Sequence, residues 1–268
     1  MEAVRFGNKE FSPIILGTNP VNGFSHQNKQ RNEEMRGYFT DEKARQLMHE
    51  AEALGVDSVV ARSDERTLAL MQEYWKEGGK IKWIVQISAD NGPDSWKPWI
   101  ERCGDAGASA MFIHGGVVDN WFANETFDNF HEALALMEKH DVARGFAGHK
   151  PEAHAWINAN LDVDFQMCSW YNPTDRGKNW KHQGEGEVWL PEHREAMFDV
   201  IRTISKPVLH YKVFAAANQP IAEAFDLMAG IVQPKDAVCF GIFPKDKPDM
   251  LKEDIDLFED KVGKSAPV

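Results

Sequence analysis

The chain has little cysteine, no long apolar run and no excess of positive charge. Only three of its 268 residues are cysteines, at positions 103, 168 and 239. An odd number of widely spaced cysteines forms neither a disulfide framework nor a zinc-binding pattern, so we expect a reducing, cytoplasmic environment. No run approaches the about 18 apolar residues of a membrane-spanning helix, and residues 1–10 lack the apolar stretch of a secretion signal. The sequence therefore predicts no membrane partner.

Acidic residues outnumber basic ones by 42 to 30, which gives a formal net charge of −12. Proteins that bind nucleic acids or anionic membranes need clustered lysine and arginine to neutralise phosphates. We therefore expect no nucleic-acid partner. The partner that we expect is a small polar substrate, and self-association into a homo-oligomer stays open.

Short apolar runs alternate with amphipathic helical stretches, a pattern typical of a parallel sheet covered by helices. Eight strands are predicted, at Pro13–Gly17, Asp57–Ala61, Trp83–Ser88, Ala110–His114, Ala143–Ala147, Phe165–Ser169, Pro207–Phe214 and Ala237–Ile242. Helices are predicted to start near Thr40, Glu65, Asp94, Glu125, Pro151, Pro191, Pro220 and Pro248. Eight strands that each lead into a helix favour a closed (β/α)₈ barrel, an α/β fold. We expect residues 1–268 to form this one domain.

Two features add to the plain barrel pattern. Residues 4–13, VRFGNKEFSP, alternate around a Gly-Asn turn, which predicts a β-hairpin across the N-terminal end of the barrel. The connections after the first and sixth barrel strands, Thr18–Phe39 and Asn172–Leu190, are longer than ordinary loops. Both leave the C-terminal rim, where barrel enzymes have their active sites, so they are expected to take part in function.

Polar side chains at the C-terminal ends of the strands are the candidate site residues, because inward residues there face the rim and are costly to bury without a partner. These residues are Asn19, Arg62, Gln86, His114, His149, Tyr171, His210 and Lys212. Trp170, Trp180 and Trp189, near the sixth-strand loop, either pack in the protein or stack on a sugar ring.

Lys212 and His114 are the predicted acid and base, with His149 as the alternative to His114. In the run PVLHYKVF, alternation places His210 and Lys212 on one strand face. If that face is the barrel interior, the Lys212 amine is suited to base or imine chemistry. A divalent metal held by His114 and His149, with His26, His210 or Cys168 as a third ligand, stays open, although no HxH or HxxxH spacing indicates it.

Four segments resemble the aldo/keto reductase superfamily, in the order in which that family has them. They are RFGNKEFSPIILGTNPVNG at the start, FIHGG at the fourth barrel strand, FQMCSWYNPTDR beginning with the sixth, and CFGIFPKDKPDMLKEDIDLFED near the end. The resemblance spans nearly the whole chain and implies a (β/α)₈ barrel that binds NAD(P)H and reduces carbonyl groups.

The resemblance also implies four catalytic residues, Asp, Tyr, Lys and His, and only the histidine is present, as His114. Ala61 or Arg62 stands near the family's aspartate, Gln86 stands at the lysine position, and no tyrosine follows the second barrel strand. Residues 148–150, Gly-His-Lys, replace the Ser-Asn that holds the nicotinamide amide. By resemblance, Gln166 and Tyr211 match the amide-binding and ring-stacking positions, and Lys245 and Lys247 are within reach of a cofactor phosphate.

These departures lead us to expect that NAD(P)H is disfavoured. The function expected from the residues is proton transfer next to a carbonyl group in a sugar-like or keto substrate, as in an isomerase, epimerase or lyase. Arg62, Gln86, Asn19, Tyr171 and His210 are the expected substrate-binding residues. The alternatives are a divergent NAD(P)H-dependent reductase and a non-catalytic relative that binds a ligand or a protein.

Overall fold

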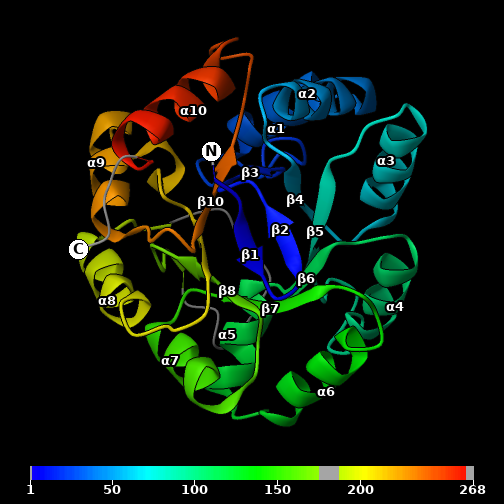
Figure 1. Cartoon of the computed structure of the whole chain (residues 1–268), viewed down its shortest axis with the longest axis vertical. Coiled ribbons are helices and arrows are strands. Elements are labelled where there is room, and N and C mark those ends of the chain that lie inside the picture. Colours follow the sequence, from blue (N-terminus) through cyan, green and yellow to red (C-terminus); the bar gives the residue numbers. More distant parts are fainter. Residues whose placement is uncertain (1, 175–186, 264–268) are drawn as a thin grey trace.

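A computed structural model of the chain, described here for residues 2–174 and 187–263, contains a closed barrel of parallel strands surrounded by helices (Figure 1). The strands follow one another around the barrel in sequence order, and the last pairs with the first. They are β3 (Ile14–Gly17), β4 (Ser58–Arg62), β5 (Lys82–Ile87), β6 (Ala110–Ile113), β7 (Ala143–Gly148), β8 (Phe165–Ser169), β9 (Val208–Tyr211) and β10 (Ala237–Gly241). The predicted (β/α)₈ barrel is confirmed.

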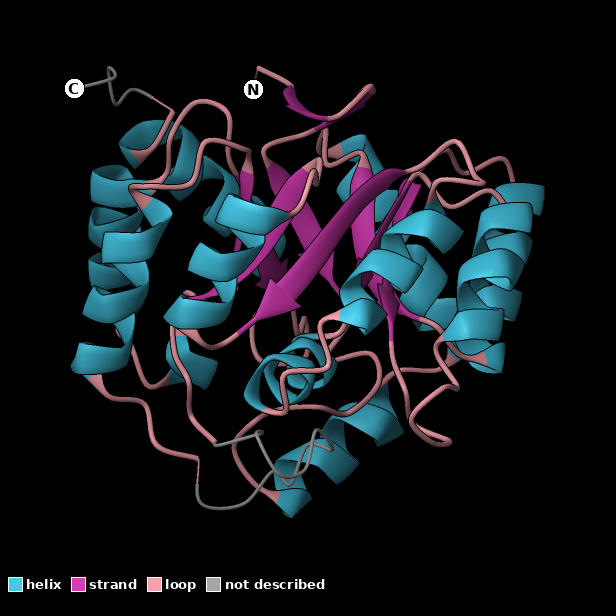
Figure 2. Ribbon diagram, turned by 90° about the horizontal axis from the view of Figure 1, so that it is seen from below, coloured by secondary structure: helices cyan, strands magenta, loops and turns pink. Residues whose placement is uncertain are grey.

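The predicted hairpin is also confirmed. β1 (Val4–Phe6) pairs antiparallel with β2 (Lys9–Phe11) around Gly7, whose φ of 58° suits a residue without a side chain. The hairpin lies at one end of the barrel, and Figure 2 shows it beyond the starts of the strands. Phe6 stacks on Phe165 at 4.6 Å between ring centroids, so the hairpin closes the N-terminal end of the barrel with aromatic side chains.

Helices cover the outside of the barrel. They are α1 (Lys29–Tyr38), α2 (Asp41–Ala53), α3 (Glu65–Lys76), α4 (Lys97–Asp105), α5 (Gly115–Ala123), α6 (Asp128–Met137), α7 (Pro151–Asn160), α8 (Pro191–Ile201), α9 (Ile221–Ile231) and α10 (Met250–Lys261). Thr40 is the N-cap of α2, as predicted, and its side chain accepts a hydrogen bond from the Lys43 backbone N–H. None of the helices in the described part of the chain is long and apolar enough to cross a membrane.

The other strand ends lie within one residue of the prediction, but two helices and the end of β9 differ more. α1 and α5 are extra helices inside connections on the C-terminal side of the barrel. The N-cap of α5 is His114, not Ser, Thr, Asp or Asn, and two glycines follow it, so α5 has no start signal in the sequence. β9 ends at Tyr211, three residues earlier than predicted, because Lys212 has a φ of 58° and leaves the extended conformation.

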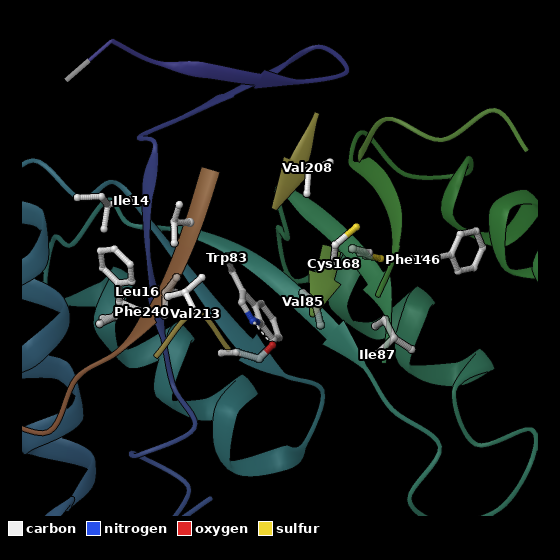
Figure 3. Packing of buried hydrophobic residues seen from close by; sticks show 14 of the residues in the cluster. Ile14, Leu16, Trp83, Val85, Ile87, Phe146, Cys168, Val208, Val213 and Phe240 are labelled. Carbon is white, nitrogen blue, oxygen red and sulfur yellow. Dashed lines mark hydrogen bonds between the residues drawn. The ribbon is translucent and has the colours of Figure 1, made fainter. Parts of the chain in front are cut away.

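Alternation along the strands separates two apolar layers. Ile15, Ile84, Phe112 and Leu209 are among the residues that fill the barrel interior with the hairpin phenylalanines. The larger layer lies between the strands and the helices, and Figure 3 shows some of its members, including Trp83, whose indole N–H donates to the Ala61 carbonyl. Successive residues of a strand point to opposite sides. A residue next to one in the interior layer therefore faces the helices, and the reverse also holds.

A buried carboxylic acid on α10 makes stability depend on pH. Asp254 lies on the buried face of α10, and burial raises its pKa from 3.8 to about 7, with a further contribution from Glu253. Between these values the folded chain keeps a proton that the unfolded chain releases, so this group favours folding at low pH and loses that contribution as pH rises through about 7.

We expect Asp254→Asn to raise the free energy of unfolding by roughly 2–4 kcal/mol at pH 8, where the wild-type carboxylate must be buried ionised, and by progressively less toward pH 4. Urea unfolding of both proteins across this pH range measures the difference. An equal gain at both ends of the range would show that packing, and not the proton, is responsible.

Candidate active site

The C-terminal rim contains a chain of three hydrogen-bonded side chains. The carboxylate of Asp119, on α5, lies 2.7 Å from Nδ1 of His149, and Nε2 of this ring lies 3.1 Å from the Tyr211 hydroxyl. Asp119 and His149 are buried, whereas Tyr211 is half-buried. The arrangement holds a tyrosine hydroxyl against a histidine whose other nitrogen is fixed by a carboxylate, which is a route for proton transfer.

Local structure explains each position in this chain. Leu209 faces the barrel interior, so alternation also turns Tyr211 inward at the end of β9. His149 follows β7 directly, and its backbone N–H and that of Lys150 donate to Oδ1 of Asp119 at 3.0 and 3.3 Å. These bonds leave Oδ2 directed at the imidazole. Two backbone N–H groups therefore fix the Asp119 carboxylate, and the fixed carboxylate orients the His149 ring.

The Tyr211 hydroxyl has two partners that suit two proton states. It lies 3.2 Å from the Gly148 carbonyl and 3.1 Å from His149 Nε2. With Nδ1–H donated to Asp119, Nε2 of a neutral ring accepts the tyrosine proton. When the ring carries two protons, Nε2–H donates to the tyrosine oxygen and the hydroxyl donates to Gly148. In each state the hydroxyl donates one hydrogen bond, and both ring nitrogens keep their partners.

A second group of rim residues surrounds Trp189. The rings of Tyr171 and His26 meet the indole edge-on, with centroids at 5.5 and 6.2 Å, and Nζ of Lys212 lies 5.4 Å from the indole centroid. Asn19 joins the group through His26, with its Nδ2 3.3 Å from His26 Nε2. Three of the predicted residues, Asn19, Tyr171 and Lys212, are thus brought to one wall of the rim.

The side chain of His26 also connects the two long rim connections. Its Nδ1 lies 3.1 Å from the carboxylate of Glu187, whose side chain is only 3% exposed. Glu187 precedes Trp189 at the end of the sixth-strand connection, whereas His26 belongs to the first. Of the other predicted tryptophans, Trp170 is fully buried and packs on Phe198 of α8, and Trp180 lies outside the described residues.

Arg62, Gln86 and His114 face the interior by the alternation of their strands, and all three are half-buried at the rim. The Arg62 guanidinium forms ion pairs with Asp64, at 2.8 Å, and with Asp90. His114 follows β6 directly as the N-cap of α5, and its carbonyl accepts the first hydrogen bonds of that helix, from Val117 and Val118. Their roles in binding or catalysis stay predictions, as does the closeness of His114 to Lys212.

The placement of His210 at the rim is wrong. His210 is fully buried on the helix-facing side of β9, where it accepts a hydrogen bond from the Trp170 indole and lies 3.3 Å from Asp236. Alternation holds only along Val208–Tyr211, and Tyr211, not His210, is the inward residue. Lys212 lies beyond the strand end, so it does not share a strand face with His210.

The described residues contain no group of three or more His, Cys, Asp or Glu side chains able to hold a metal ion. Two of the three proposed third ligands do not face the barrel interior. His210 and Cys168 belong to the helix-facing layer, and burial raises the pKa of the Cys168 thiol well above its usual value. The predicted ligands therefore do not come together as a metal site in the described part of the chain.

Gln166, the residue at the amide-binding position by resemblance, also belongs to the helix-facing layer. Its side chain is fully buried, and its Oε1 lies 2.7 Å from Nδ1 of His154 on α7. Burial lowers the pKa of His154, so that ring is neutral. Gln166 and His154 form an internal pair and do not line the rim.

Sequence reasoning missed two of the three members of the Asp119–His149–Tyr211 chain. Tyr211 was assigned only a stacking position, although its alternation with Leu209 would have turned it inward. Asp119 carried no signal, because the helix that positions it has no recognisable start.

No protein-family model matches the chain, and no curated protein matches its sequence. Solved structures do share its fold. A Pseudomonas aeruginosa protein assigned to the aldo-keto reductases is 17% identical, with a TM-score of 0.63 over 97% of this chain and 96% of that one. The glycerol dehydrogenase AKR11B4 from Gluconobacter oxydans is 11% identical, with a TM-score of 0.50 over 99% and 97%.

A third structure, the D53A mutant of Gox0644 in complex with NADPH, is 12% identical, with a TM-score of 0.57 over 96% of this chain and 88% of that one. It contradicts the expectation that NAD(P)H is disfavoured. That expectation rested on the missing Tyr, Lys and Ser-Asn, yet a protein with the same barrel fold is in complex with NADPH. The chain has the barrel fold of the aldo/keto reductases.

Proposed function

We propose that the chain is an NAD(P)H-dependent carbonyl oxidoreductase in which Tyr211 is the proton donor. The observation that carries the proposal is the hydrogen bond between the Tyr211 hydroxyl and His149, whose other nitrogen is fixed by Asp119. The sequence lacks a tyrosine after the second barrel strand. Tyr211, at the end of the seventh barrel strand, supplies a phenol hydroxyl in its place. The fold shared with aldo-keto reductases supports this reading over an isomerase or lyase.

The residues at the rim fit a nicotinamide dinucleotide in two respects. Tyr211 presents its ring and hydroxyl inward, and the loop after β10 carries Lys245 and Lys247, near the position where barrels often bind phosphate. These lysines form exposed ion pairs with Glu34 and Glu253. Exposed pairs contribute only about 0–1 kcal/mol, so a phosphate group can replace the carboxylates at little cost.

A bound NAD(P)H would supply the hydride for the carbonyl carbon in the proposed reaction. Tyr211 donates its proton to the carbonyl oxygen as the alcohol forms. The tyrosinate then takes a proton from Nε2 of a doubly protonated His149 ring, whose positive charge the Asp119 carboxylate stabilises, and the neutral ring regains that proton from solvent. The restored hydroxyl donates to Nε2 while the ring is neutral and to the Gly148 carbonyl once Nε2 is protonated again. In the reverse direction the same groups remove the proton of an alcohol.

The first test is nucleotide binding followed by turnover. We expect NADPH to quench tryptophan fluorescence with a micromolar Kd, about −8 kcal/mol, and to be oxidised in the presence of small hydroxylated aldehydes or ketones, measured at 340 nm. Lys245→Met is expected to weaken NADPH binding about tenfold, because a charged hydrogen bond contributes about 1.5–3 kcal/mol.

Lys252→Met is the matched control, because Lys252 is an exposed lysine of α10 that pairs with Asp256. It should leave the Kd unchanged. Failure of both NADPH and NADH to bind below about 1 mM would end the reductase proposal. Binding without turnover of any carbonyl would instead favour the non-catalytic relative.

A further inference from the structure

The N-terminal turn of α5 lies against the proposed proton donor. Gly115 is the first residue of α5, and Asp119 follows four residues later, so both lie on one face of the helix. Asp119 binds one edge of the His149 ring, and Gly115 lies against the ring and the Tyr211 hydroxyl together. One helix turn therefore contacts every member of the Asp119–His149–Tyr211 chain.

The space beside Gly115 has no room for a side chain. A Cβ built on Gly115 would lie 2.9 Å from the Tyr211 hydroxyl oxygen, 2.9 Å from Cε1 of His149 and 3.1 Å from its Nδ1. Distances below 3.0 Å are essentially never seen for a Cβ, so the hydroxyl, the imidazole or the helix would have to move. The imidazole is held by Asp119, which leaves the Tyr211 side chain as the group that would be displaced.

The backbone does not require glycine at this position. Gly115 lies within a helix and is not among the glycines with positive φ. Alanine has a higher helix propensity than glycine, so helix formation gives no reason for glycine here. The close approach of Tyr211 and His149 does give a reason.

We infer that Gly115 is a positioning residue that sets the contact between the Tyr211 hydroxyl and His149. The absence of a side chain lets the hydroxyl come within 3.1 Å of Nε2, which is the distance that proton transfer requires. This inference rests on the proposed function for its catalytic consequence, but the contact itself can be measured without any substrate.

The test compares Gly115→Ala with Gly230→Ala. Gly230 lies near the end of α9, and nothing lies within 4 Å of a Cβ built there. We expect Gly115→Ala to lower kcat by about 100-fold, as a displacement of about 1 Å can do, while KM and the Kd for NADPH change less than twofold. Gly230→Ala should leave all three constants unchanged.

A second measurement does not depend on activity. With ¹⁵N-labelled histidine, the Nε2 resonance of His149 should move in Gly115→Ala toward the value that it takes in Tyr211→Phe, because both changes remove the same hydrogen bond. In the Tyr211→Phe background, Gly115→Ala should move it little further.

An unchanged Nε2 resonance in Gly115→Ala, or a kcat within threefold of wild type, would overturn the inference. If the wild-type protein reduces no carbonyl group, the reductase proposal fails by itself, and the Nε2 resonance still decides whether Gly115 sets the contact.

Discussion

Tyr211→Phe is expected to lower kcat by about 10²–10⁴-fold, because it removes the proton donor and keeps the aromatic ring. KM and the Kd for NADPH should change little, since the ring still faces the interior at the end of β9. The lost hydroxyl makes neutral hydrogen bonds with Gly148 and His149, so we expect the free energy of unfolding to fall by only about 1 kcal/mol. Steady-state kinetics with NADPH and a small carbonyl substrate measure the effect.

Tyr74→Phe is the matched control for this substitution. Tyr74 is a buried tyrosine of α3 whose hydroxyl donates to Glu52, on the outer side of the barrel and away from the rim. Its replacement should reduce stability and leave kcat unchanged. A Tyr211→Phe enzyme with full kcat would remove Tyr211 from the mechanism and return attention to His114 and Lys212 as proton donors.

The barrel could be predicted from the sequence because its signal is repeated. Each parallel strand is buried on both faces, so it is a short apolar run such as Ala110–Ile113 or Phe165–Ser169, and each run is followed by an amphipathic helix. An error of one or two residues at an end does not alter that pattern. The position of a single side chain at the rim has no such redundancy.

The site could be predicted only in part, for two physical reasons. Period-two alternation says which residues of a strand share a face, but not which face points into the barrel. The hypothesis that Lys212 points inward selected the wrong face of β9. Leu209 decides it, because it packs against the hairpin phenylalanines while His210 bonds to Trp170 and Asp236. The second reason is α5, which begins at two glycines without a capping side chain and is held by tertiary contacts, so Asp119 was not identified.

Charge at the rim bears on the kind of carbonyl compound that the site accepts. The Arg62 guanidinium already pairs with Asp64 and Asp90, and Glu187 adds a buried carboxylate next to His26. A negatively charged substrate would either have to displace these carboxylates or lie close to them, where like charges repel. Hydroxyl groups, in contrast, can donate to Asp90, whose side chain is 51% exposed. These contacts favour a neutral hydroxylated substrate over a sugar acid.

Asp119→Asn is expected to lower kcat by about 10³–10⁴-fold through the tautomer of His149. The asparagine carbonyl can still accept from the backbone N–H groups of His149 and Lys150, which then turns its NH₂ group toward Nδ1. Nδ1 becomes an acceptor and the one ring proton lies on Nε2, so returning a proton to the tyrosinate would leave an imidazolate instead of a neutral ring. An aspartate-to-asparagine change that reverses a histidine tautomer in the serine proteases costs about 10⁴-fold.

Asp236→Asn provides the control, because Asp236 is also buried, accepts the backbone N–H groups of Val208 and Gln233, and contacts a histidine, His210, outside the rim. Both substitutions should lower the melting temperature, since each changes a buried carboxylate that several donors satisfy. Only Asp119→Asn should lower the kcat of the folded enzyme and move the His149 ring nitrogens to the other tautomer in the ¹⁵N spectrum. Equal losses of kcat in the two variants would mean that Asp119 acts through stability, and His149 would then have no assigned role in returning the proton to Tyr211.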